Sequence, residues 1–195
     1  MTDPTDATDA AGTVAGIPFE EDLRLETAQE ARDLGRRLAG ALRAGDLLIL
    51  TGELGAGKTT FTQGLAEGLG VRGPITSPTF VIARVHPSLV GGPVLVHADA
   101  YRLSGELDLE ALDLDADLDR AVTVVEWGKG LAEALSEDHL EVVLTRAVGG
   151  AAPSPAGRGE DDKDSEPAED LDDSEDAEAA DPRTVRLVGH GDRWA

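Results

Sequence analysis

Residues 52–59 read Gly-Glu-Leu-Gly-Ala-Gly-Lys-Thr and match the pattern G-x-x-x-x-G-K-[ST], which is typical of a phosphate-binding loop, or P-loop. Glycine lets backbone N–H groups turn inward around phosphate oxygens, and the following helix points its positive end at the same anion. Lys58 would neutralise the β- and γ-phosphates, and the Thr59 hydroxyl would coordinate Mg²⁺. The pattern therefore predicts a site for ATP or GTP. The candidate nucleotide ligands are Gly52, Glu53, Leu54, Gly55, Ala56, Gly57, Lys58 and Thr59.

Two acidic residues follow short apolar runs that read as strands of a parallel sheet. Asp99 comes after residues 94–98, and Glu126 comes after residues 122–125. Ligands of such sheets bind at the carboxyl ends of the strands, and a P-loop protein needs an acidic residue there to organise Mg²⁺ and water. We therefore expect Asp99 and Glu126 to be catalytic together with Lys58, and to be metal ligands together with Thr59. The sequence leaves open which carboxylate activates the water.

Five further side chains are candidates, and each has an alternative structural explanation. GTPases place a hydroxyl that senses the γ-phosphate in the loop after the P-loop helix, where Ser77 and Thr79 stand in this chain. Tyr101 and Trp127 could stack on a base or could fill the core, and the sequence does not separate these roles. His97 is expected to pack or to make structural hydrogen bonds.

The elements that must position these residues alternate between strands and helices. A capping box at Thr27–Glu30 precedes apolar residues at helical spacing, and this helix is expected to end at Gly45. Residues 46–51 read as a buried parallel strand, and residues 58–69 as a helix that Gly70 ends. Further strands are expected at 80–83, 94–98, 122–125, 140–144 and 185–187, with a short helix at 131–135. The predicted fold is an α/β, P-loop NTPase-like domain, with a mostly parallel sheet flanked by helices and an antiparallel C-terminal edge hairpin.

The charge is concentrated in two segments of the 195-residue chain, whose net charge is −22. Residues 151–182 contain 13 acidic and 2 basic residues, and residues 1–22 contain 6 acidic and no basic residues. The expected organisation is a flexible tail (1–18), an ATPase domain (19–146), a disordered acidic insertion (147–182) and a final strand (183–195). The acidic balance argues against stable nucleic-acid binding by this chain itself. With no cysteine, no signal peptide and no apolar run long enough for a membrane span, we expect a cytoplasmic protein.

Four blocks of the sequence, in this order, resemble the bacterial P-loop ATPase family of tRNA threonylcarbamoyladenosine biosynthesis, called TsaE or YjeE. The blocks are Gly52–Phe61, Ser77–Phe80, His97–Leu103 and Glu126–Trp127, and Thr27 also fits. The resemblance covers about residues 20–146, and residues 183–189 are similar to the family's last strand. The chain departs from the family at Ala98 and at Gly128-Lys129, and neither change touches the phosphate chemistry. The acidic insertion at 151–182 is not part of the family pattern, and it could alter partner docking or have no effect.

The resemblance implies a compact ATPase that hydrolyses Mg-ATP weakly alone and more usefully within a complex. The implied partners are the TsaB–TsaD pair, which transfers a threonylcarbamoyl group to N6 of A37 in tRNA, so that tRNA is contacted only through that complex. By the same resemblance, Thr60 would hold phosphate with Lys58 and Thr59, and Thr79 would sense phosphate. Trp127 would lie beside the nucleotide, and Thr27 near its adenine end.

Two other functions remain possible from the sequence. A small-molecule or nucleoside kinase needs an acceptor pocket and an Arg-bearing lid, but the long insertion here is acidic and would repel phosphates. A nucleotide-dependent binding switch that does not hydrolyse would have no need of Thr59, Asp99 and Glu126 together. A guanine-specific GTPase is disfavoured because no N-K-x-D sequence is present.

Overall fold

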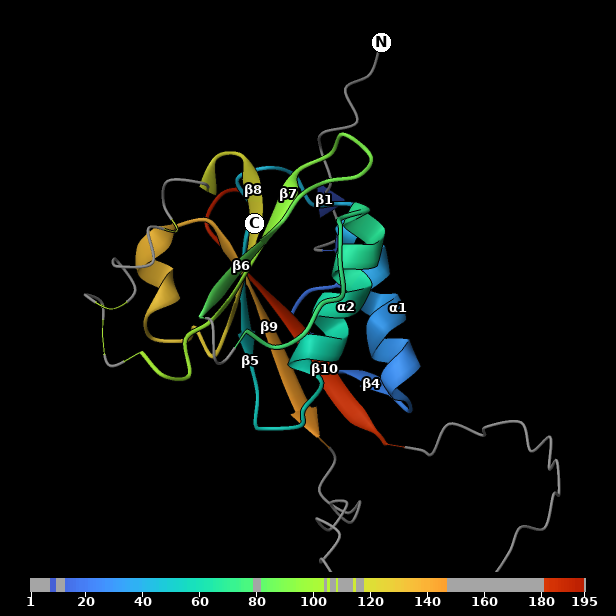
Figure 1. Ribbon diagram of the computed structural model, residues 1–195. Helices are drawn as coiled ribbons and strands as arrows, with labels where there is room; N and C mark the ends of the chain where they lie inside the picture. The colour runs from blue at the N-terminus through green and yellow to red at the C-terminus, as the bar shows by residue number, and fades with distance from the viewer. Residues whose placement is uncertain are drawn as a thin grey trace, which may run out of the picture.

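The computed structural model describes residues 8–9, 13–78, 82–103, 105, 108, 114, 118–146 and 181–194. Its main feature is a seven-stranded sheet with the order β4-β10-β9-β5-β8-β7-β6 (Figure 1). In chain order the strands are β4 (Leu23–Leu25), β5 (Leu47–Thr51), β6 (Ala83–His86), β7 (Val94–Asp99), β8 (Ala121–Glu126), β9 (His139–Arg146) and β10 (Arg183–His190). Strands β9, β5, β8 and β7 are parallel, whereas β6, β10 and β4 pair antiparallel at the two sides. The predicted α/β fold and its C-terminal hairpin of β9 and β10 are confirmed.

Two helices, α1 (Ala28–Ala39) and α2 (Lys58–Leu69), lie side by side against one face of the sheet (Figure 1). They can approach closely because Gly35 has no side chain, and a Cβ atom at this position would collide with the backbone of Phe61. Helix α2 ends at Gly70 as predicted, but α1 ends at Gly40 and not at Gly45. Glycine is a poor helix former, so the helix does not continue past Gly40. The chain makes a turn instead, in which the Asp46 carboxylate accepts a hydrogen bond from the Arg43 backbone N–H.

The opposite face of the sheet has a smaller core of its own. Leu47, Ile49, Val96 and Val125 pack there with Ala132, which belongs to the short 3₁₀ helix η1 (Ala132–Leu135). Strand β5 is therefore covered on both faces, as its continuous apolar run predicted. This burial fixes the strand from which the P-loop emerges.

The N-terminal segment is more ordered than its composition suggested. Short strands β1 (Thr8–Asp9), β2 (Thr13–Val14) and β3 (Ile17–Pro18) form a three-stranded sheet. The predicted flexible tail is wrong for residues 13–18, because the side chains of Val14 and Ile17 are fully buried against the main core. The acidic stretch 147–180 lies outside the described residues, while Asp181 lies inside them. None of the described helices is long and apolar enough to cross a membrane.

Candidate nucleotide site

The P-loop connects β5 to α2 and depends on glycine at two positions. Gly52 has φ +149° and Gly57 has φ +101°, which favour glycine because a side chain rarely adopts such a backbone. A Cβ atom at Gly52 would collide with the carbonyl oxygen of Leu144, and one at Gly57 would collide with the Arg183 guanidinium. The loop backbone thus packs closely against Leu144 of β9 and the Arg183 side chain of β10, and α2 begins at Lys58.

Lys58 is a buried cation held by weak partners. Its Nζ donates to the carbonyl oxygens of Gly52 at 2.7 Å and Glu53 at 3.0 Å, and lies 3.8 Å from the centre of the Trp127 ring. Burial lowers the pKa of Lys58, and the nearby charges of Glu126 and Asp99 oppose this effect. An anionic phosphate is a stronger partner for an ammonium group than a carbonyl or a ring face, so the site favours an anion.

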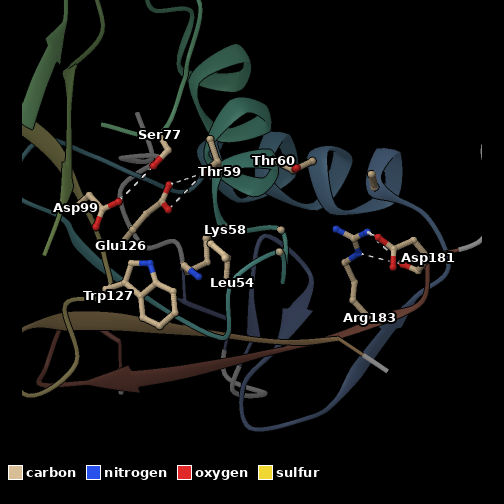
Figure 2. Close-up of a pocket in the computed structure, with 13 residues that line it drawn as sticks. Leu54, Lys58, Thr59, Thr60, Ser77, Asp99, Glu126, Trp127, Asp181 and Arg183 are labelled. Carbon is tan, nitrogen blue, oxygen red and sulfur yellow. Dashed lines mark hydrogen bonds and ion pairs between the residues drawn. The ribbon is translucent and has the colours of Figure 1, made fainter. Parts of the chain in front are cut away.

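Glu126 joins the P-loop helix to the sheet. It ends β8, is almost fully buried, and accepts from the Thr59 hydroxyl at 2.9 Å (Figure 2). The Nε2 atom of the fully buried His97 lies 2.9 Å from the same carboxylate oxygen. Two neighbours from different elements therefore fix the direction of this carboxylate.

Asp99 lies beside Glu126 because the two residues are register partners at the ends of β7 and β8. Its carboxylate accepts from the Tyr101 backbone N–H at 2.9 Å and from the Ser77 hydroxyl at 3.3 Å. The two predicted carboxylates thus share one end of the site with Thr59 and Ser77 (Figure 2).

Trp127 is held in the site at a conformational cost. Its φ of +60° is left-handed, which costs a bulky residue about 1–2 kcal/mol. Its backbone N–H donates to the Leu50 carbonyl oxygen at 2.9 Å, and its ring meets the Tyr101 ring with centroids 5.2 Å apart. Together these contacts hold the indole against Lys58, at the wall of the pocket.

These groups surround a pocket of about 320 Å³, which is within the size range of small-molecule sites. Ser77, Asp99 and Glu126 lie at one end, and Thr60, Asp181 and Arg183 lie at the other (Figure 2). The residues that line it are Ala28, Leu54, Gly55, Gly57, Lys58, Thr59, Thr60, Ser77, Asp99, Glu126, Trp127, Asp181 and Arg183.

The structure brings most of the predicted site residues together. Three predicted P-loop residues, Gly52, Glu53 and Ala56, are not among the described residues that line this pocket, and Thr27 and Thr79 are two further exceptions. Thr27 uses its hydroxyl to cap α1, accepting from the Glu30 N–H at 3.1 Å, while its neighbour Ala28 lines the pocket. Thr79 lies outside the described residues, so its predicted role stays a prediction. Sequence reasoning missed Asp181 and Arg183, whose placement comes from the pairing of β10 with β9 and from no local motif.

The oxygen ligands at the carboxylate end of the pocket are of the kind that Mg²⁺ prefers. This ion is usually held by one or two carboxylates together with substrate phosphates and water. Thr59 and Glu126 already place hydroxyl and carboxylate oxygens within 2.9 Å of each other, and Asp99 ends the adjacent strand. These three residues could therefore hold the ion while the P-loop holds phosphates.

Comparisons with known proteins bear on the family and the fold of this chain. The family model described as "Threonylcarbamoyl adenosine biosynthesis protein TsaE" matches residues 25–150. A Streptomyces coelicolor protein, "tRNA threonylcarbamoyladenosine biosynthesis protein TsaE", is 69% identical over 62% of this chain and 82% of its own length. A Bacillus subtilis protein of the same description is 39% identical over 64% and 77% of the two chains.

A solved structure gives the same answer for the fold. The crystal structure of Bacillus subtilis YdiB has a TM-score of 0.58 and 27% sequence identity, and covers 89% of this chain and 88% of that chain. The family match spans the P-loop, both strand-end carboxylates and Trp127. The chain therefore belongs to the TsaE family of threonylcarbamoyl adenosine biosynthesis proteins.

Proposed function

We propose that this protein binds Mg-ATP in the pocket and slowly hydrolyses it to ADP and phosphate, to drive turnover of a tRNA-modifying complex. The observation that carries the proposal is the hydrogen bond from Thr59 to Glu126. It joins the P-loop hydroxyl that would meet Mg²⁺ to a buried carboxylate at the end of a neighbouring strand. This is where Mg²⁺ and an attacking water would be organised beside the terminal phosphate.

In this mechanism the protein binds the phosphates, orients the attacking water and accepts one proton from it. Lys58 and the backbone N–H groups at the start of α2 hold the phosphates, and Thr60 extends this cradle. Glu126 accepts a proton from the attacking water. The water oxygen bonds to the terminal phosphorus while the bond from that phosphorus to the ADP oxygen breaks. Bound Mg²⁺ would supply neutralisation of charge on the phosphates.

His97 and Thr59 keep the Glu126 carboxylate aimed into the pocket. Asp99, held by Ser77 and by the Tyr101 N–H, would position the ion and its water. Trp127 covers Lys58 and keeps water away from it. Each of these groups would work by preorganisation, which is the main source of rate in phosphoryl transfer.

The family assignment places the protein in tRNA threonylcarbamoyladenosine biosynthesis. Within that process we propose the TsaB–TsaD pair as its partner, contact with tRNA only through that pair, and a cytoplasmic location. The product would be N6-threonylcarbamoyladenosine at position 37, made by the partners and sustained by ATP turnover here.

The test is ATP hydrolysis by the purified protein, alone and with the cognate TsaB–TsaD pair. We expect slow release of phosphate that the partners stimulate and that Glu126→Ala abolishes. Transfer of phosphate to a small acceptor, without stimulation by the partners, would instead support a kinase.

A further inference from the structure

The pocket wall opposite the catalytic carboxylates is built by Arg183, the first residue of β10. Its side chain is only 3% exposed, which is rare for arginine unless the cation is paired. Its Nη2 donates to the Asp181 carboxylate at 2.6 Å, and Nε and Nη2 each lie 3.2 Å from the Asp181 carbonyl oxygen. A guanidinium is thus fixed in one orientation at the wall (Figure 2).

This guanidinium lies against the P-loop itself. A Cβ atom built on Gly57 would collide with Nη1 of Arg183, and one built on Gly55 would lie 3.7 Å from Nη1 of Arg146. Gly57 is also the N-cap residue of α2, so the Arg183 cation and the positive helix end lie side by side. The local charge is thus positive beside the phosphate-binding backbone.

The charge balance at this wall also favours an anion. Asp181 offers one oxygen to Arg183 and the other to Arg146, whose Nε lies 2.8 Å from it. Two guanidinium groups therefore share a single carboxylate, which leaves one positive charge in excess. This excess stands out in a chain whose net charge is −22.

We propose that Arg183 is a further nucleotide-binding residue, whose guanidinium contacts the phosphate that lies nearest Thr60, and that Asp181 is the positioning residue that aims it. The proposal rests on the ATPase function given above. Hydrolysis occurs at the terminal phosphate, which must face Glu126 and Asp99. The opposite end of the pocket, where Thr60 and Arg183 lie, then receives the α-phosphate.

Calorimetric titration of Mg-ADP and Mg-ATP into five variants, Lys58→Ala among them, tests this assignment. Arg183→Gln should weaken binding by about tenfold or more, because a charge-assisted hydrogen bond to phosphate is lost. Arg183→Lys should recover part of the affinity. Asp181→Asn keeps an oxygen that accepts from Arg183 but removes a negative charge, so it should bind as tightly as the parent or more tightly. The matched control is Arg186→Gln, an exposed arginine of the same strand that pairs with Asp22, and it should leave binding unchanged.

The outcomes separate this assignment from the proposed function and from a merely structural role. If Lys58→Ala loses binding while Arg183→Gln binds within twofold of the parent, the Arg183 assignment is overturned and the function stands. If Lys58→Ala binds normally, the proposed function itself fails. If Arg183→Gln and Asp181→Asn weaken binding equally and lower the melting temperature equally, the pair only holds the strand in place, and the assignment is again wrong.

Discussion

Replacing Glu126 by Gln separates chemistry from folding in this site. The carboxylate accepts from Thr59 at 2.9 Å and lies 2.9 Å from Nε2 of His97. Both contacts are made to the same carboxylate oxygen, and a glutamine carbonyl oxygen in its place can still accept from the Thr59 hydroxyl and from the Nε2–H of His97. Both contacts survive, while the negative charge is removed.

The magnitudes follow from those contacts. Because both hydrogen bonds persist, we expect the free energy of unfolding to change by no more than about 1 kcal/mol, which is a few degrees in melting temperature for a chain of this size. Loss of a general base lowers the rate by about 10²–10⁴-fold. Nucleotide affinity should stay the same or rise, since a negative charge beside the phosphates has gone.

The assay is single-turnover hydrolysis of radiolabelled ATP, with binding measured separately by calorimetry. Asp99→Asn is the matched comparison, because Asp99 ends the adjacent strand in register with Glu126 and is equally buried. If Glu126→Gln hydrolyses ATP within threefold of the parent while Asp99→Asn is inactive, then Asp99 activates the water and the assignment to Glu126 is refuted.

Three further predictions concern the loop, the pH dependence and the acidic insertion. Gly57→Ala should lower the free energy of unfolding by about 1–3 kcal/mol and weaken ATP binding, because φ is +101° and the new methyl group would meet Arg183; chemical denaturation and calorimetry check this. Burial lowers the pKa of His86 below its ordinary 6.5, so below that pH the unfolded chain binds the extra proton and stability falls; His86→Gln should lose less melting temperature between pH 7.5 and 5.5 than the parent does. Replacing residues 151–178 by a short Gly-Ser linker should leave the melting temperature unchanged or slightly higher, and a fall of more than about 5 °C in a thermal melt would contradict the disorder expected from composition.

Most of the fold could be predicted because its signals are local. The run Leu47–Leu50, the glycine loop and the helix ending at Gly70 all follow from consecutive residues, and the structure has them where expected. The N-terminal segment could not be predicted in this way. Val14 and Ile17 are separated by Ala15 and Gly16 and follow no strand or helix periodicity, so no local pattern signals their burial against the assembled core.

The site residues also differ in whether a local sequence signal predicted them. Lys58 and Thr59 belong to one motif, and Asp99 and Glu126 were found because parallel strands end at a common edge. Arg183 gave no such signal, because its place depends on the register between β9 and β10 across a long stretch of chain. The capping role of Thr27 was visible in its own segment, whereas the lining role of Ala28 was not.

The long connection between β9 and β10 can carry an acidic insertion without disturbing the site, because the register is set elsewhere. Eight residue pairs align the two strands, from Arg183 opposite Arg146 to His190 opposite His139. The ion pair of Arg146 with Asp181 then closes the base of the connection at 2.8 Å. Loop-closure entropy grows only logarithmically, so residues 147–180 cost about 2 kcal/mol more than a four-residue turn would. A paired hairpin offsets that cost easily, which means that the connection can lengthen and gain charge while Arg183 keeps its place against the P-loop.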